Sequence, residues 1–327
     1  MNGYIDMHCD TLSVALREHK STMTSLPDAM VDIDRLSRSD CGAQFFAMFL
    51  AQHPEGYMYG YDVIPPLEQI VLDMYRIFEN TLEAEKERLS FAGNYDDLCR
   101  NRAADKLSAF LTLENGWPVK GKLENLKKLY DMGIRLITLT WNDPNCFGQN
   151  HSSDPELAKK GLTDFGKEAV EAMNELGIII DVAHLNDGGI ADVAAISERP
   201  FVASHSNCRA LAPHSRNLTD EQIRLLGNKG GVAGINFYSA FLNRDPKDEL
   251  SRTERMCDHI EHFINTGGIE CAGIGTDFDG ITCALEINDC TEMYKLFDAL
   301  HKRGLSDDEI ELIGFKNVER VIRESMK

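Results

Sequence analysis

Eight short, β-rich apolar runs recur along this 327-residue chain, and stretches of helical periodicity separate them. Strands that alternate with helices form parallel sheets, because each helix returns the chain to the same end of the sheet. Eight such units predict an α/β fold, a closed (β/α)₈ TIM barrel, with an open doubly wound sheet as the alternative. The runs lie near residues 3–9, 43–50, 108–114, 135–141, 177–184, 200–206, 230–237 and 271–278.

Amphipathic helices are predicted between these runs, and the segment 66–88 has the clearest spacing of apolar side chains. We expect Thr163, Thr219 and Ser251 to cap three of the other helices. Gly304 is a predicted stop between two additional C-terminal helices. No internal repeat or linker interrupts the sequence, so a single domain over residues 1–327 is expected. The other helical segments are 163–173, 187–196, 219–226, 251–264, 289–303 and 307–324.

The overall charge limits the classes of partner. The formal net charge is −19, so most of the surface would repel nucleic acid, and a small substrate is the expected partner. No targeting segment opens the sequence and no apolar run is long enough to span a membrane, which predicts a soluble, cytoplasmic protein without membrane attachment. Nine cysteines without a C-x-x-C pair are typical of a reducing compartment without a disulfide framework.

Charged and imidazole residues gather at the ends of five of the predicted strands. In a closed barrel the carboxyl ends of all strands converge on one mouth, whereas an open sheet collects ligands at a single switch point. This distribution therefore favours the barrel and predicts a site at its mouth. The residues are His8 and Asp10 at the first strand, Glu114 at the third, His184 at the fifth, His205 at the sixth and Asp277 at the eighth.

This set of side chains indicates a metal site. Imidazole together with carboxylate suits Zn²⁺ and related ions, whereas Ca²⁺ and Mg²⁺ prefer oxygen ligands alone. Five candidate ligands, with Glu114 able to bridge, fit two metals better than one. Two ions about 3.5–4 Å apart can share a hydroxide and polarise a carbonyl. The plainer alternatives are a capped strand end for His8 and Asp10, a helix cap for Glu114, and buried histidines bonded to backbone carbonyls for His184 and His205.

Two further residues suggest hydrolysis of an amide bond. Asp277 is a candidate for the base that takes the nucleophile's proton and passes it to a leaving nitrogen. Asp279 competes for this role, but Gly280 indicates that the chain is turning, so we interpret Asp279 as a turn or cap residue. Arg216 follows the sixth strand and could bind a substrate carboxylate with two hydrogen bonds, the alternative being an exposed loop arginine.

Several short segments, in this order, resemble the renal or membrane dipeptidase family, metallopeptidase family M19, whose members belong to the amidohydrolase-like barrels. The likeness runs from residue 4 to about residue 322 and suggests an intracellular, bacterial-type member. The segments are 6–11, 114–116, 135–140, 181–184, 204–206, 216–217, 236–238, 275–280 and 314–321.

The resemblance implies a role for each candidate. His8 and Asp10 would hold one zinc ion, His184 and His205 the second, with Glu114 and a hydroxide bridging the two. Asp277 would transfer the proton and Arg216 would bind the C-terminal carboxylate of a dipeptide. Tyr238 is a weaker candidate for substrate contact, and a homodimer is an expectation from the family alone.

One position departs from the family pattern. Where better-known members read Leu-Thr-His after the fourth strand, this chain has Trp141 followed by Asn142. Tryptophan offers one N–H and cannot titrate, so it cannot reproduce both roles of an imidazole near the substrate carbonyl. Asn142 or His151 could substitute, although each could equally be an ordinary loop residue.

The leading hypothesis is a cytosolic dinuclear zinc dipeptidase in which Asp277 acts as general base and acid. A second hypothesis keeps the barrel and metals but changes the bond to a cyclic amide, an N-acyl amino acid or a lactone. Many relatives of that type bridge their metals with a carboxylated lysine, and Glu114 in that position disfavours this hypothesis. The third is an inactive metal-binding relative, for which Trp141 is the main support.

Overall fold

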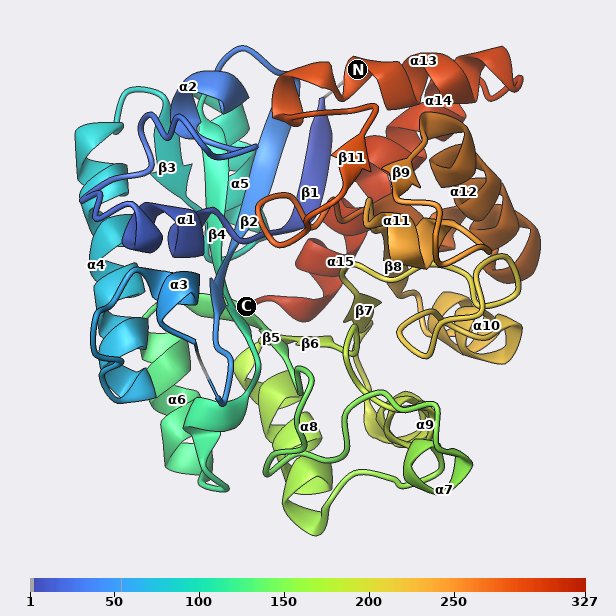
Figure 1. Cartoon of the computed structure of the whole chain (residues 1–327), viewed down its shortest axis with the longest axis horizontal. Helices are drawn as coiled ribbons and strands as arrows, with labels where there is room; N and C mark the ends of the chain where they lie inside the picture. Colours follow the sequence, from blue (N-terminus) through green and yellow to red (C-terminus); the bar gives the residue numbers. More distant parts are fainter. Residues whose placement is uncertain (1–2, 54) are drawn as a thin grey trace.

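A closed parallel barrel forms the centre of the molecule. The computed structural model describes residues 3–53 and 55–327, and helices surround the strands within these ranges (Figure 1). The eight barrel strands of this part are β1 (Tyr4–Cys9), β2 (Cys41–Phe49), β4 (Leu107–Glu114), β5 (Ile134–Thr138), β6 (Ile179–Asp181), β7 (Val202–Ala203), β8 (Val232–Ile235) and β10 (Ala272–Ile274). Their order is β2-β1-β10-β8-β7-β6-β5-β4, and β4 pairs with β2 to close the ring. Each strand overlaps one predicted run, so the predicted TIM barrel is confirmed and the open sheet was the wrong alternative.

The predicted helices are present with small changes at their ends, and a π-helical turn at Leu312–Lys316 divides the predicted C-terminal segment 307–324 into two helices. The helices are α1 (Thr11–Arg17), α2 (Ile33–Leu36), α3 (Gly56–Tyr59), α4 (Leu67–Ala84), α5 (Tyr95–Ala103), α6 (Leu123–Asp131), α7 (Pro155–Ala158), α8 (Asp164–Leu176), α9 (Asp187–Ile196), α10 (Asp220–Asn228), α11 (Ser239–Leu242), α12 (Thr253–Gly267), α13 (Tyr294–Lys302), α14 (Asp307–Glu311) and α15 (Asn317–Ser325).

Two of the three predicted caps form. The hydroxyl of Thr163 accepts from Gly166 N at the start of α8, and Thr219 forms a capping box with Gln222 at the start of α10. The prediction for Ser251 was wrong, because Ser251 lies in the short strand β9 (Leu250–Ser251) and α12 begins at Thr253. Pairing of β9 with β11 (Ala284–Leu285) keeps the backbone extended through this position.

The barrel interior is filled by large apolar side chains below the mouth. Phe45 and Phe110 stack with their ring centroids 4.4 Å apart, and α15 adds Val318 and Val321 to the same buried cluster. Burial of each such side chain stabilises the fold by about 1.5–3 kcal/mol. The C-terminal helix thus closes the N-terminal end of the barrel, which leaves the opposite end as the place for a site. A ninth strand, β3 (Leu89–Phe91), extends the sheet beside β4.

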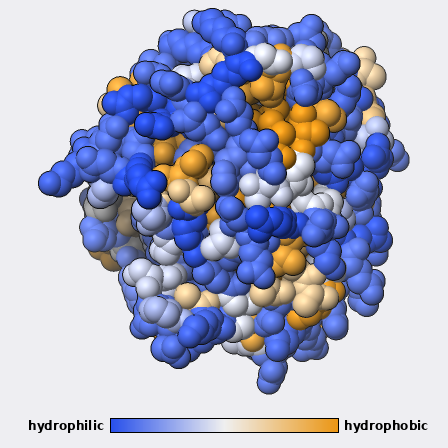
Figure 2. Space-filling model, turned by 90° about the vertical axis from the view of Figure 1, so that its right-hand side faces the viewer, coloured by the Kyte–Doolittle hydropathy of each residue, from blue (hydrophilic) through white to orange (hydrophobic). Residues whose placement is uncertain are grey.

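The outer surface is mostly polar. Hydrophilic residues cover most of the face in Figure 2, with smaller apolar patches between them. Among the residues that the structure describes, none of the helices is both long enough and apolar enough to cross a bilayer.

Candidate metal centre

The six predicted ligand and proton-transfer residues meet at the C-terminal ends of the barrel strands. Along β4, Phe110, Thr112 and Glu114 alternate with outward-facing residues, so Glu114 points into the mouth above the packed interior. Each of the six side chains is nearly or completely buried. His8 lies in β1 and Asp10 directly after it, His184 and His205 follow β6 and β7, and Asp277 follows β10.

Glu114 lies between two groups of possible ligands. Its Oε1 is 2.9 Å from His184 Nε2 and 3.5 Å from His205 Nε2. Its Oε2 is 3.6 Å from His8 Nε2, which in turn lies 3.5 Å from Asp10 Oδ2. The carboxylate therefore faces one histidine pair with one oxygen and a histidine–aspartate pair with the other. This is the arrangement in which a single glutamate can bridge two ions.

The donor set fits divalent metal ions. In the groups His8–Asp10–Glu114 and Glu114–His184–His205, one ligand atom from each residue lies within 4.8 Å of the others. Both ring nitrogens of His8, and Oδ1 of Asp10, are buried without a hydrogen-bond partner among the described residues. A buried polar atom without a partner costs folding free energy, and a cation bound here would satisfy the Asp10 oxygen and one ring nitrogen of His8.

Electrostatics distinguish the two sides of the centre. Burial lowers the pKa of His8, but the nearby carboxylates of Glu114 and Asp10 outweigh this effect and raise it to about 10. Burial lowers the pKa values of His184 and His205 well below the usual value, and positive neighbours, including Arg216, lower them further. These two imidazoles are therefore neutral at pH 7, the form in which histidine binds a metal.

Asp277 is held by both its backbone and its side chain. Its φ of +61° lies in the left-handed region, and the strand β10 has already ended at Ile274, earlier than the predicted run 271–278. Asn236 Nδ2 donates to Asp277 Oδ2 at 2.8 Å, while Oδ1 faces His8 Nε2 at 3.8 Å. Burial raises the pKa of Asp277 to about 6. A carboxyl group with this pKa can exchange a proton near neutral pH.

The structure separates Asp279 from Asp277. The side chain of Asp279 accepts from Thr11 Oγ1 at 2.6 Å and from Met30 N at 2.5 Å, and its φ of +70° is that of a turn residue. Gly280 follows with no side chain, and a Cβ there would lie 2.1 Å from Asp10 Oδ2 and 2.6 Å from Asp277 Oδ1. The missing side chain of Gly280 thus leaves room for both carboxylates.

Arg216 is buried, not an exposed loop arginine. Its Nη1 donates to Ala183 O and, at 3.0 Å, to Ser206 Oγ, while Nη2 donates to His205 O at 3.3 Å. A guanidinium has five N–H groups, so two remain, and Nε has no partner among the described residues. The free N–H groups match the two oxygens of one carboxylate.

These groups open into a cavity of about 400 Å³ at the barrel mouth. Trp141 and Tyr238 both line it, and the indole of Trp141 contacts the Phe49 ring edge-on at a centroid distance of 4.9 Å. Asn142 also lines the cavity, and its Oδ1 lies 3.2 Å from His184 Nδ1. His151 stands behind it, with Nε2 3.0 Å from the same Asn142 oxygen. Asn142 therefore contacts a candidate ligand directly, and His151 contacts Asn142.

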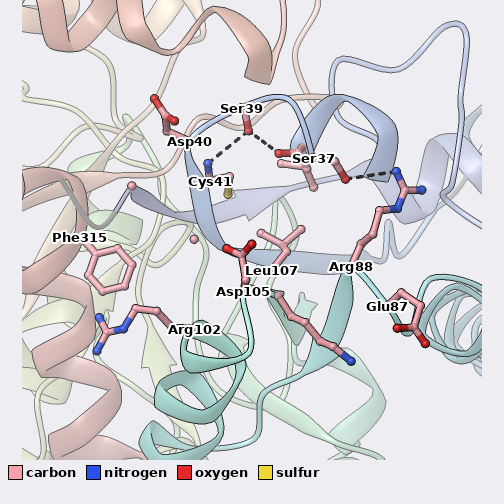
Figure 3. Close-up of a pocket in the computed structure, with 14 residues that line it drawn as sticks. Ser37, Ser39, Asp40, Cys41, Glu87, Arg88, Arg102, Asp105, Leu107 and Phe315 are labelled. Carbon is pink, nitrogen blue, oxygen red and sulfur yellow. Dashed lines mark hydrogen bonds between the residues drawn. The ribbon is translucent and has the colours of Figure 1, made fainter.

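A larger cavity, of about 570 Å³, lies at the opposite, N-terminal end of the barrel (Figure 3). Its arginines are already paired, Arg88 with Asp34 at 3.0 Å and Arg102 with Glu319 at 3.0 Å. The groups of three possible ligands found among the described residues all lie at the mouth instead. The catalytic candidates of a TIM barrel belong at the carboxyl ends of its strands, so the smaller cavity is the candidate site.

Sequence reasoning gave no role to Asn236 and used Gly280 only as the sign of a turn, although both lie in segments that carry the family resemblance. Asn236 orients Asp277, and Gly280 provides space beside it. Nothing in a single sequence indicates that the asparagine two residues before Tyr238 has a function. Its role depends on the neighbouring strand.

Comparisons with known proteins identify the family of this chain. The family model for membrane dipeptidases, peptidase family M19, matches residues 2–327. The chain is similar to dipeptidase tcpJ of Claviceps purpurea, with 27% identity over 296 residues that cover 90% of this chain and 69% of that protein. It is also similar to the crystal structure of dipeptidase AC, a family M19 metallopeptidase, with a TM-score of 0.89, 26% identity and coverage of 99% and 98%. A Rhodobacter sphaeroides metallopeptidase, liganded with a phosphinate mimic of the dipeptide L-Ala-D-Ala, has a TM-score of 0.87 and 25% identity, with 99% of each chain covered.

Proposed function

Since the chain belongs to the membrane dipeptidase family, peptidase family M19, and is a metallo-dipeptidase, we propose that it hydrolyses dipeptides with two zinc ions bound at the barrel mouth. The observation that carries this proposal is the position of Glu114, with one carboxylate oxygen toward each group of possible ligands. One ion would be held by His8, Asp10 and Glu114, and the other by Glu114, His184 and His205.

Zinc ions bound there would supply an activated water and polarise the scissile carbonyl. Asp277 would accept the proton of the attacking water at Oδ1, since Asn236 already donates to its Oδ2. The same oxygen then protonates the leaving amine, a role that its raised pKa supports.

Arg216 selects the length of the substrate. Its two free N–H groups bind the C-terminal carboxylate of the dipeptide, and the carbonyls of Ala183 and His205 hold the guanidinium in place. Because this anchor is fixed relative to the ligand histidines, it would set the distance between the substrate's C-terminal carboxylate and the carbonyl that is cleaved. The dipeptide mimic bound to the similar Rhodobacter sphaeroides enzyme supports this substrate class.

The test is elemental analysis of the purified protein combined with a substrate screen. We expect two tightly bound zinc equivalents and hydrolysis within a panel of L,L- and L,D-dipeptides. Parallel panels of hydantoins, N-acyl amino acids and lactones identify the alternative amide or lactone hydrolase. Normal metal content with no hydrolysis in any panel would identify an inactive relative, and fewer than two equivalents in active enzyme would contradict the dinuclear proposal.

A further inference from the structure

Two buried residues beneath His205 have no role in the mechanism above. Asp181 is the last residue of β6, and Ser204 directly follows β7. Both side chains are fully buried, and they lie in the segments 181–184 and 204–206 that also carry the ligand histidines. Their hydrogen bonds connect them to the ring nitrogen of His205 that faces away from the centre.

Asp181 accepts four hydrogen bonds. The backbone N–H groups of Ala183 and Ser204 donate to its Oδ1 at 3.0 and 2.8 Å. The hydroxyls of Thr138 and Ser204 both donate to its Oδ2 at 2.6 Å. A carboxylate offers only acceptors, so the single hydroxyl hydrogen of Ser204 points toward Asp181.

The orientation of Ser204 determines the tautomer of His205. With its hydrogen directed to Asp181, Ser204 Oγ presents a lone pair to His205 Nδ1 at 2.7 Å. The ring must therefore carry its proton on Nδ1, because a neutral imidazole has one donor and one acceptor nitrogen. Nε2 then carries the lone pair on the side of the metal centre, where it lies 3.1 Å from His184 Nε2 and 3.5 Å from Glu114 Oε1.

We propose that Asp181 and Ser204 are positioning residues that fix His205 in its Nδ1–H form. They would thereby set the affinity of the metal position formed by Glu114, His184 and His205, called the second metal position below. This inference rests on the metal centre of the proposed function. Partners behind a ligand histidine commonly change metal affinity about 10- to 100-fold when removed. His8, by contrast, has no hydrogen-bond partner on either ring nitrogen among the described residues. The metal position formed by His8, Asp10 and Glu114 should therefore not depend on Asp181 and Ser204.

The first test is Ser204→Ala in the full chain, with both zinc dissociation constants measured by chelator competition. We expect one equivalent to bind about 10- to 100-fold more weakly and the other to stay within about twofold of wild type. Ser108→Ala is the matched control, because Ser108 is also a fully buried barrel serine but bonds to Asn101, away from the centre. Unchanged affinities in Ser204→Ala, or an equal loss in Ser108→Ala, would overturn the proposal.

The second variant, Asp181→Asn, keeps the volume of the side chain and covers the case in which Ser204→Ala does not fold. The new amide nitrogen avoids the two backbone N–H groups at Oδ1 and takes the place of Oδ2, where it donates to Ser204. The hydroxyl hydrogen then turns to His205 Nδ1 and moves the ring proton to Nε2, which blocks that metal ligand.

Nitrogen–proton correlation spectra of histidine-labelled, metal-free protein report this change directly. We expect an Nδ1–H signal for His205 in the wild type and an Nε2–H signal in Asp181→Asn, together with weaker zinc binding. Retention of the Nδ1–H signal in the variant would refute the proposal that Asp181, through Ser204, determines the tautomer of His205. The spectra do not depend on turnover, so failure of the dipeptide screen and failure of this inference are separate results.

Discussion

Replacement of Arg216 by lysine tests whether the guanidinium recognises the C-terminal carboxylate. Lysine keeps the positive charge but lacks the planar arrangement of donors. In the wild type, three partners hold the guanidinium and two N–H groups remain for the substrate. A lysine ammonium has three donors in all, so it cannot hold the same carbonyls and also bind a carboxylate through two bonds.

The size of the effect follows from the lost hydrogen bond. A hydrogen bond to a charged group contributes about 1.5–3 kcal/mol, which corresponds to about a 10- to 150-fold decrease in kcat/KM. The decrease should appear mainly in KM, because the carboxylate is bound equally in the ground state and the transition state.

The assay compares a good dipeptide substrate with its C-terminal amide in both enzymes. Wild type should prefer the free carboxylate, and Arg216→Lys should lose most of that preference because its rate on the amide changes little. Zinc content and melting temperature of the variant serve as controls, since Arg216 also bonds to Ala183 and His205. An equal decrease for acid and amide, with zinc content intact, would show that Arg216 does not recognise the carboxylate.

Two substitutions and two measurements on His8 test other parts of the centre. Asp277→Asn should lower kcat by about 10²- to 10⁴-fold with both zinc equivalents retained, and full activity on every dipeptide that the wild type cleaves would refute its role in proton transfer. His8, with a pKa raised to about 10, is protonated at pH 7 in metal-free protein, so calorimetry in buffers of different ionisation enthalpy should detect proton release on zinc binding. Protonation of His8 stabilises the metal-free fold fully below the usual histidine pKa of about 6.5, and this stabilisation is lost as the pH rises through about 10. The melting temperature in the presence of a chelator should therefore fall over that pH interval. A melting temperature that does not change with pH would contradict the positive charge assigned to His8. Gly280→Ala places a methyl group 2.1 Å from Asp10 Oδ2 and should reduce activity and zinc content, whereas Gly148→Ala, with its nearest contact at 3.5 Å, should change neither.

The fold was predictable because strand and helix patterns repeat in order along the chain. Each barrel strand overlaps a short apolar run, and the (β/α)₈ topology alone brings the ends of β1, β4, β6, β7 and β10 to one mouth. The meeting of His8, Glu114 and His205 therefore follows from topology without knowledge of any contact. The capping prediction failed at Ser251, where pairing between two-residue strands decided the backbone conformation and left no pattern in the sequence.

The choice between Asp277 and Asp279 shows what sequence periodicity cannot resolve. Two residues apart on an extended strand, both carboxylates would face the mouth. Left-handed backbone at both positions instead points one at His8 and the other at Thr11 and Met30. Asparagine and aspartate adopt this conformation more easily than most residues, so the two aspartates allow the turn but do not predict it from the sequence.

The support behind the ligands depends on register between strands. Thr138 and Asp181 are paired residues on β5 and β6, and this pairing places the hydroxyl of Thr138 on the carboxylate that also binds Ser204. A shift of one residue in β6 would turn Asp181 to the other face and leave Ser204 without its acceptor, whereas a shift in β5 would remove the hydroxyl of Thr138 from the same carboxylate. The tautomer of His205 is therefore a consequence of sheet register, which no single strand encodes. For this reason the sequence predicted His205 as a metal ligand but did not predict the residues that orient its ring.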